Sequence, residues 1–252
     1  MVYGGIMPNI RLDKFLADVG VGTRSQVKEI TKKGRVCVND NVVKKTDIKI
    51  DTENDVVTLD GKRLAYFEYE YFMLNKPQGV VSATKDNLSK TVVELITESK
   101  RRDLFPVGRL DKDTEGLLII TNDGVLANNI LAPGKHVDKT YYAVVDGRAT
   151  EDTVDLFSAG VDIGDDELTK PAVLEILSVT DDESGASQSK VKITITEGRY
   201  HQIKRMFNAV GMEVTYLKRL SMGPIFLDET LECGTYRRLT DEEIKLLREV
   251  HR

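Results

Sequence analysis

The pattern of apolar and polar positions divides the chain into a helical front and a longer part rich in strands. Near the front, apolar residues spaced three and four apart predict a helix with one buried face, made by Leu12, Phe15, Leu16 and Val19. A second helix is predicted to begin at Thr23, because the T-x-x-Q spacing matches a capping box, and to end at Gly34. Alternating residues around the turn 39–41 then predict a β-hairpin.

The rest of the chain predicts strands joined irregularly by hairpins and helices. Beyond the strand-like YEYFMLNKP, strands are expected at 117–121, 139–146, 171–179, 190–196 and 213–219. Helices are expected at 91–98, 151–159, 200–210 and 241–250. This succession favours an α+β fold. We expect a small domain of two helices and a β-hairpin with its connector, residues 1–65, and a larger domain, residues 66–252, with a mixed, mostly antiparallel sheet and flanking helices.

Composition narrows the class of protein. The chain has 252 residues, of which 40% are hydrophobic and 31% charged, as in globular proteins of one large or two smaller domains. It has neither a membrane-length apolar run nor the apolar core of a signal peptide. The opening MVYGGIM is either a tag remnant or precedes an alternative start at Met7. Two distant cysteines, Cys37 and Cys233, and three histidines in no ligand spacing predict reduced thiols, no zinc site and a cytoplasmic protein.

Charge is unevenly distributed along the front of the chain. The net charge of −5 argues against a protein that coats nucleic acid non-specifically. However, residues 24–45 hold seven Lys or Arg against two acids, whereas residues 46–60 hold one Lys against five acids. A solvated helix face is one interpretation, and contact with RNA phosphates is the other. The candidate RNA-binding residues here are Arg24, Lys28, Lys32, Lys33 and Arg35.

Three stretches of the second part carry candidate chemistry. GRLDKDTEGL, residues 108–117, leads into a buried-looking strand and holds Asp111. KTYYAVV places Tyr141 and Tyr142 on opposite faces of a strand, so one ring is expected in the core and the other could meet a flat ligand. EGRYHQIKRMFNAVG predicts an amphipathic helix whose polar side carries His201, Lys204, Arg205 and Asn208. No dinucleotide-binding, Walker A or serine-hydrolase motif is present.

These stretches, in this order, resemble three successive motifs of the ribosomal small-subunit (16S rRNA) pseudouridine synthases, and NKPQGVVS and LTKPAVLEI resemble that family too. Residues 10–60 are similar to the RNA-binding domain of the ribosomal-protein S-four type. The resemblance implies an rRNA-modifying isomerase that flips a uridine out of its stack, detaches the base at N1 and rejoins it to the sugar through C5. It implies no cofactor and no metal. The implied partner is small-subunit RNA, in a partly assembled particle or free, and the enzyme is expected to be a monomer.

The resemblance also assigns roles to residues. Asp111 matches the catalytic aspartate, acting as nucleophile or as base, and Lys204 matches the cation that pairs with it. Tyr141 matches the tyrosine that stacks on the flipped base, although a core aromatic remains an alternative. Arg109 matches the arginine that fills the gap left in the RNA; its alternative is an ion pair with Asp111 or Asp113. His201, which the reaction does not require, is expected to be a polar structural residue at the RNA-binding surface, beside Arg199 and Arg205.

Other functions stay open at this point. A synthase of the same family that modifies large-subunit RNA would share most of these motifs. An N-glycosylase using Asp111 would release free base, which an isomerase does not. A ribosome-assembly factor would bind RNA without turnover, but it would have no use for the combination of Asp111, Tyr141 and Lys204. We also expect that a fragment beginning at residue 66 is a folded domain, and that this domain isomerises RNA poorly.

Overall fold

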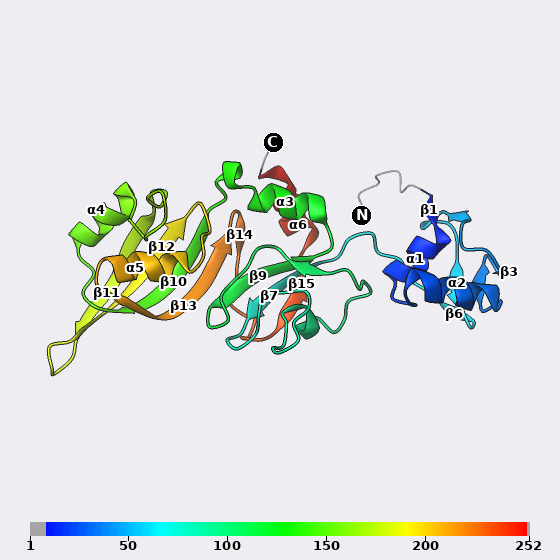
Figure 1. Cartoon of the computed structure of the whole chain (residues 1–252), viewed down its shortest axis with the longest axis horizontal. Coiled ribbons are helices and arrows are strands. Elements are labelled where there is room, and N and C mark those ends of the chain that lie inside the picture. The colour runs from blue at the N-terminus through cyan, green and yellow to red at the C-terminus, as the bar shows by residue number, and fades with distance from the viewer. Residues whose placement is uncertain (1–8, 251–252) are drawn as a thin grey trace. The chain divides into compact units, whose positions relative to one another are not determined.

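The chain folds into two units and crosses between them three times. The computed structural model describes residues 9–250, and the origin of residues 1–6 lies outside them. Within the described range, the first unit holds residues 9–70 and 97–104, and the second holds residues 71–96 and 105–250. Figure 1 shows the elements of both units. No helix of the described residues is long and apolar enough to span a bilayer.

The first unit contains the two predicted helices and the predicted hairpin. Helix α2 begins with the expected capping box: the Thr23 amide donates to Gln26 Oε1 at 2.8 Å, and the Gln26 amide donates to Thr23 Oγ1 at 3.4 Å. Asn39 and Asp40 have φ values of 49° and 64°, which suit a tight turn between paired strands. The elements are β1 (Ile10–Arg11), α1 (Leu12–Asp18), α2 (Arg24–Lys32), β2 (Val36–Val38), β3 (Asn41–Val43), β4 (Lys49–Ile50), β5 (Val57–Leu59) and β6 (Lys62–Arg63).

One apolar cluster holds this unit together. The helices bury Leu12, Phe15, Leu16 and Val27 against strand residues, and Tyr66 stacks on Phe15 with ring centroids 5.2 Å apart. Strands β3, β2, β5 and β6 form a sheet in that order, and β1 pairs with β4. The expected small domain of two helices with a hairpin is therefore confirmed, and its sheet is larger than the hairpin alone.

Residues 97–104 return to the first unit after the chain has entered the second. The buried guanidinium of Arg101 contacts Asp18 at 3.0 Å, and Glu70 accepts hydrogen bonds from Ser99 Oγ and from the amides of Lys100 and Arg101. A single division at residue 65 does not include residues 97–104 in the first unit. The sequence pattern does not predict this return of the chain, because the contacts that hold the segment are polar and join residues far apart in sequence.

The second unit is built on one sheet, in the order β11-β12-β10-β13-β9-β7-β15, with β14 beside β13 and β8 beside β9. All of these strand pairs are antiparallel except β13 with β9. The α+β expectation is confirmed. The strands are β7 (Tyr71–Lys76), β8 (Phe105–Pro106), β9 (Glu115–Thr121), β10 (Lys139–Asp146), β11 (Val173–Asp181), β12 (Ser187–Ile195), β13 (Glu213–Met222), β14 (Ile225–Phe226) and β15 (Tyr236–Arg238).

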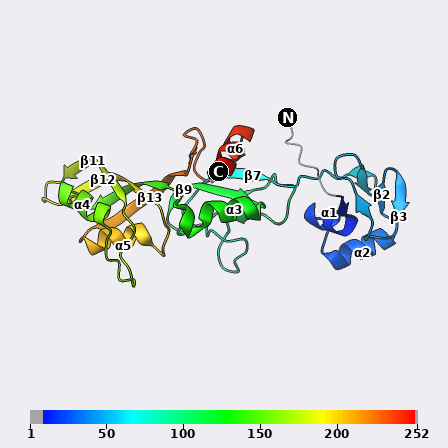
Figure 2. The same cartoon turned by 90° about the horizontal axis from the view of Figure 1, so that it is seen from above.

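Helices cover the two ends of this sheet differently. Figures 1 and 2 show α4 (Glu151–Ala159) and α5 (Gln202–Ala209) with the strands β10 to β13, and α3 (Gly124–Leu131) and α6 (Asp241–Glu249) with β7 and β9. A large apolar cluster fills the α3–α6 end. At the other end, Phe157 of α4 packs on Phe207 of α5 with centroids 4.9 Å apart.

The predicted helix at 91–98 is wrong. Only the 3-10 turn η1 (Val93–Leu95) forms there, after an isolated bridge between Val81 and Thr91. β-branched residues dominate this stretch and disfavour a helix, and residues from 97 onward pack with the other unit. Conversely, α3 was not predicted, although Asp123 caps it by accepting from the Leu126 amide at 3.0 Å. A second short turn, η2 (Pro133–Lys135), follows it.

Candidate active site

The candidate aspartate lies in a loop that is fastened to the protein by its backbone. The loop connects β8 to β9, and the Thr114 amide closes it by donating to the Asp111 carbonyl at 3.1 Å. Ser82 Oγ donates to the Leu110 carbonyl at 2.8 Å and accepts from the Leu110 amide at 3.0 Å. The backbone on either side of Asp111 is therefore fixed, and its side chain is 29% exposed.

A buried lysine holds the same loop from beneath. Lys76 at the end of β7 is fully buried, and its ammonium donates to the carbonyls of Pro77, Lys112 and Thr114 at 3.0, 3.3 and 2.8 Å. Burial lowers the pKa of Lys76 to about 8, and the nearby carboxylates of Asp113 and Asp111 oppose that change. Sequence reasoning noted the stretch NKPQGVVS but assigned no role to Lys76.

A glycine allows the loop to enter the sheet. Gly116 has φ +100°, and a Cβ there would lie 2.2 Å from the carbonyl oxygen of Arg219 on β13. Only a residue without a side chain permits this approach, which forms the parallel contact between β9 and β13. The shape of the loop before β9 thus has a steric cause at Gly116. The close contact joins the two halves of the sheet at the place where Asp111 is held.

Helix α5 brings two side chains to the aspartate. His201 Nε2 lies 3.5 Å from Asp111 Oδ1, and Lys204 Nζ lies 3.8 Å from Asp111 Oδ2. The hydrogen bonds of Lys204 go to Asp113 instead, whose two carboxylate oxygens accept at 2.6 and 2.7 Å. That hydrogen bond lowers the pKa of Asp113. Lys204 is therefore placed beside Asp111 with a second, more exposed carboxylate competing for it.

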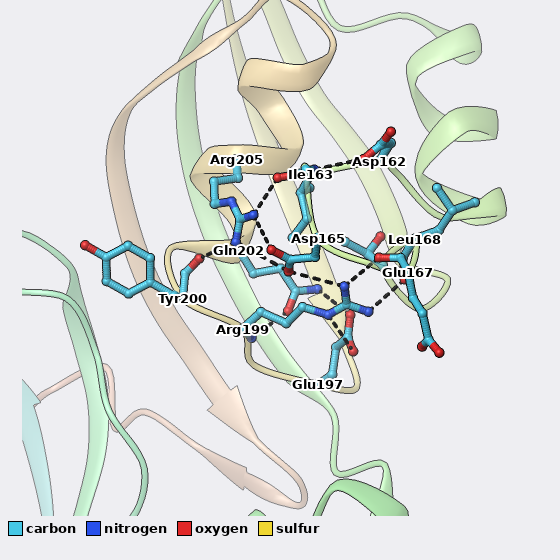
Figure 3. A network of polar contacts seen from close by, with 12 residues as sticks. Asp162, Ile163, Asp165, Glu167, Leu168, Glu197, Arg199, Tyr200, Gln202 and Arg205 are labelled. Carbon is cyan, nitrogen blue, oxygen red and sulfur yellow. Dashed lines mark hydrogen bonds and ion pairs between the residues drawn. The ribbon is translucent and has the colours of Figure 1, made fainter.

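The N-terminal end of α5 is fastened by two arginines that were expected to bind RNA. Arg199 donates to the carbonyls of Glu167 and Leu168, each at 2.7 Å, and Arg205 donates to the carbonyl of Ile163 at 2.5 Å. Both arginines also form ion pairs with Asp165. Figure 3 shows these contacts converging between the segment 162–168 and the start of the helix. An RNA phosphate would have to compete with Asp165 for either guanidinium.

Tyr141 lies in the sheet, two strands from the aspartate loop. Its neighbours in register are Ile193 on β12 and Arg219 on β13, and Arg219 in turn pairs with Gly116. The Tyr141 side chain is 7% exposed. Tyr142 is half-buried and meets Tyr216 edge-on. The two rings thus differ in burial, and Tyr141 is the more enclosed one.

Arg219 is a second residue that sequence reasoning missed. It is 1% exposed, and its Nε donates to the Leu117 carbonyl at 2.7 Å. Within the described residues, its Nη2 has no hydrogen-bond partner. Burial and the charge of Arg219 together lower the pKa of Lys139, which begins strand β10 two residues before Tyr141. The alternation of a strand predicts polar side chains on its exposed face and apolar side chains on its buried face. It therefore does not predict a buried arginine.

The remaining predicted RNA-binding residues lie on surfaces. Arg109 is exposed two residues before Asp111. Within the described residues, Asp111 forms its ion pairs with His201 and Lys204, and Asp113 forms its ion pair with Lys204. In the first unit, Arg35 binds Asp60 through Nε at 2.9 Å. The other candidates share exposed positions on or just after α2: Arg24, Lys28, Lys32 and Lys33.

Comparisons with known proteins now identify the class. A family model described as RNA pseudouridylate synthase matches residues 70–209, and the S4 domain matches residues 10–57. The chain is 47% identical to an uncharacterised RNA pseudouridine synthase, YtzG, of Bacillus subtilis, with 95% of this chain and 99% of that one covered. It is 42% identical to ribosomal small subunit pseudouridine synthase A of Escherichia coli K12, with 93% and 98% covered.

A solved structure supports the same assignment. A pseudouridylate synthase crystal structure, 39% identical, superposes with a TM-score of 0.64 over 94% of this chain and 99% of that one. The resemblance seen in the motifs is confirmed, and so is the expectation of an enzyme that modifies RNA. The chain belongs to the RNA pseudouridylate synthase family, with an S4 domain near its N-terminal end and similarity over nearly its full length to the ribosomal small subunit synthases A.

Proposed function

We propose that this enzyme converts one uridine of small-subunit (16S) ribosomal RNA to pseudouridine after flipping it out of the RNA stack. The observation that carries the proposal is the placement of Asp111: its loop is fastened by backbone hydrogen bonds, and Lys204 and His201 approach its carboxylate from α5. The choice of small-subunit RNA follows the names of the relatives that the chain resembles over nearly its whole length.

We assign the reacting carboxylate to Asp111. The isomerisation breaks the bond from the sugar C1′ to N1, forms a bond from C1′ to C5, removes the hydrogen of C5 and leaves one on N1. A fixed carboxylate can serve this sequence as a nucleophile or as a base. The ammonium of Lys204 supplies positive charge beside it. The atoms balance without an external reactant, so the proposed reaction needs neither cofactor nor metal.

We assign Tyr141 and Arg109 to the flipped nucleotide and to the gap it leaves. With 7% of its surface exposed, Tyr141 offers the uracil only a small part of its ring unless neighbouring side chains move. Arg109 is exposed next to Asp111 and can enter the RNA stack that the uridine has left. Such a contact offsets part of the cost of unstacking, which is a few kcal/mol.

We assign RNA targeting to the basic surface of the first unit, formed by the exposed side chains of Arg24, Lys28, Lys32 and Lys33. Phosphate contacts of this kind hold RNA without reading its sequence. Arg35, Arg199 and Arg205 are proposed as weaker contacts, because carboxylates already bind them. The substrate is small-subunit RNA, free or in a partly assembled particle, bound by a monomer in the cytoplasm.

The proposal is tested by pseudouridine mapping with a carbodiimide on small-subunit RNA from cells that lack the protein. Wild-type enzyme and Asp111→Asn are added separately to naked RNA and to partly assembled particles. We expect one new pseudouridine with wild-type enzyme, in at least one substrate, and none with Asp111→Asn. New sites in large-subunit RNA alone would contradict the target. Tight binding by both proteins without modification would contradict turnover and favour an assembly factor.

A further inference from the structure

An exposed aromatic side chain stands beside the proposed catalytic carboxylate. Tyr200 precedes helix α5, and 75% of its side chain is exposed to solvent. Its ring stacks on the imidazole of His201, with centroids 3.9 Å apart and planes inclined by 16°. One face of the tyrosine is thus covered by a flat neighbour. The rest of the ring is open to solvent and can meet a flat ligand.

The backbone that carries this ring pair is held in one conformation. His201 has φ 48°, in the left-handed region that few non-glycine residues adopt, and this bend precedes the first turn of α5. Gln202 Oε1 accepts from the Arg199 amide at 2.9 Å, and Arg205 Nη1 donates to the Tyr200 carbonyl at 3.3 Å. Figure 3 shows the Tyr200 ring directed away from this network while its carbonyl faces it. The ring is therefore presented by a fixed backbone.

The stack begins at the site of the proposed chemistry. His201 Nε2 lies 3.5 Å from Asp111 Oδ1, so the imidazole that stacks on Tyr200 also contacts the carboxylate through a ring nitrogen. A nucleotide that delivers its base to Asp111 brings its neighbours in the RNA to within a few ångströms of this surface. When a uridine flips out, the adjacent base loses a stacking partner, and a flat side chain can replace it.

We propose that Tyr200, supported by His201, is a stacking platform for an RNA base adjacent to the flipped uridine. This inference rests on the proposed function and adds a binding contact to it. Every base has a π-face, so the platform accepts any neighbour and contributes affinity and placement rather than sequence choice. Loss of one base–aromatic contact of this kind weakens binding by about 5- to 150-fold.

The first test separates stacking from charge. Binding of an oligouridylate of about 12 nucleotides and of an abasic oligomer of equal length is measured by fluorescence anisotropy. Both carry the same phosphates, and only the first carries bases. We expect Tyr200→Ala to weaken oligouridylate binding by about 5-fold or more without changing binding of the abasic oligomer, and Tyr200→Phe to bind as wild type does. Equal binding of the two oligomers by wild-type enzyme, or equal loss on both with Tyr200→Ala, would overturn the platform.

The matched control is Phe226→Ala. Phe226 is an aromatic side chain of similar exposure, 70%, and it lies on β14 rather than beside Asp111. We expect this variant to bind both oligomers as wild type does. Thermal unfolding of each variant completes the control, because substitutions at exposed positions change the free energy of unfolding by less than about 0.5 kcal/mol. Equal weakening by Phe226→Ala would show a general surface effect and overturn the platform.

The second test uses turnover and keeps the platform distinct from the proposed function. On RNA that the wild type modifies, we expect Tyr200→Ala to raise KM by about 5-fold or more with much less change in kcat, because the contact exists before and during the reaction. A fall in kcat alone would place Tyr200 in the chemistry and overturn the platform. An effect on particles but not on naked RNA would point to a protein contact and overturn it as well. Failure of wild-type turnover would refute the proposed function, whereas the oligomer test would still decide the platform.

Discussion

Replacement of the buried lysine under the aspartate loop should change how stability depends on pH. In Lys76→Met, the side chain keeps an unbranched apolar stem and loses the ammonium that donates to the carbonyls of Pro77, Lys112 and Thr114. The pKa of Lys76 is about 8 in the folded chain, against 10.5 in an exposed lysine. Between these values, the unfolded chain binds a proton that the folded chain has released. Folding is therefore favoured increasingly as pH rises through this window.

The magnitude follows from the difference between the two pKa values. It corresponds to a gain of about 3.4 kcal/mol in the stability of the wild type from about pH 8 to about pH 10.5. The three carbonyl acceptors stabilise the ammonium, so this figure is an upper bound, and we expect about 1 to 3 kcal/mol. The variant lacks this contribution, and all other titrating groups cancel in the difference between the two proteins.

Urea unfolding of both proteins at about pH 7 and about pH 10.5 measures this quantity. We expect the stability of wild type minus that of Lys76→Met to become more positive by about 1 to 3 kcal/mol at the higher pH. A difference that does not change with pH would refute the lowered pKa of Lys76 in the folded chain, from which this prediction follows. Because a displaced loop moves Asp111, we also expect kcat to fall by about 10-fold or more at pH 7.

Three further substitutions test other parts of the account. In a tritium-release assay, Asp113→Asn should retain turnover within about fivefold, because an exposed ion pair such as that with Lys204 contributes only about 0.2–1 kcal/mol. A loss of turnover as complete as in Asp111→Asn would contradict the separate assignment of the two carboxylates. In a denaturant titration, Gly116→Ala should lower the free energy of unfolding by about 3 kcal/mol, because its Cβ would meet a backbone carbonyl at 2.2 Å. The control Gly61→Ala, at φ +77° with open space around it, should lower it by about 1 kcal/mol. Equal losses would contradict the steric explanation. Lys28→Ala should reduce the slope of log binding constant against log salt by about 1, and an unchanged slope would remove this side chain from the RNA-binding surface.

Removal of the first unit does not test RNA targeting alone, because it also affects how the rest of the chain packs. A fragment that begins at residue 66 lacks Asp18, the partner of Arg101 at 3.0 Å, and most of the unit with which residues 97–104 pack. The truncation therefore disturbs the packing of this segment as well as removing the RNA-binding surface. Substitutions of exposed lysines on α2 leave this contact intact, and they separate RNA binding from folding.

Local patterns predicted much of the fold. Strand β10 and helix α4 have the predicted bounds, because both alternate or repeat clearly between strong turn signals. The helix expected at 91–98 failed because its β-branched residues and long-range contacts override an apolar spacing. Helix α3 was missed although its cap and its buried residues Leu126, Ala127 and Ile130 follow helical spacing. The path of residues 97–104 depends on distant ion pairs, which no local pattern contains.

Only part of the site could be predicted from the sequence. Helical spacing placed His201 and Lys204 on one face, and the motif resemblance associated Lys204 with Asp111, from which it lies 3.8 Å away. The contact of His201 with Asp111 at 3.5 Å was not predicted, because His201 was expected to be only a polar structural residue. The competition from Asp113 and the buried cations at Lys76 and Arg219 depend on how β7, β9 and β13 meet. Such contacts join segments far apart in sequence, so periodicity could not reveal them.

The most direct measurement of the central claim follows the hydrogen on C5. Small-subunit RNA labelled with tritium at C5 of uridine releases tritium to water only when that hydrogen is removed, and release of free uracil is followed in the same reaction. We expect wild-type enzyme to release tritium without free uracil, and Asp111→Asn to release no tritium although it binds the RNA equally well. Tritium release by Asp111→Asn at the wild-type rate would contradict the assignment of the reaction to this carboxylate, and free uracil in the product would contradict isomerisation.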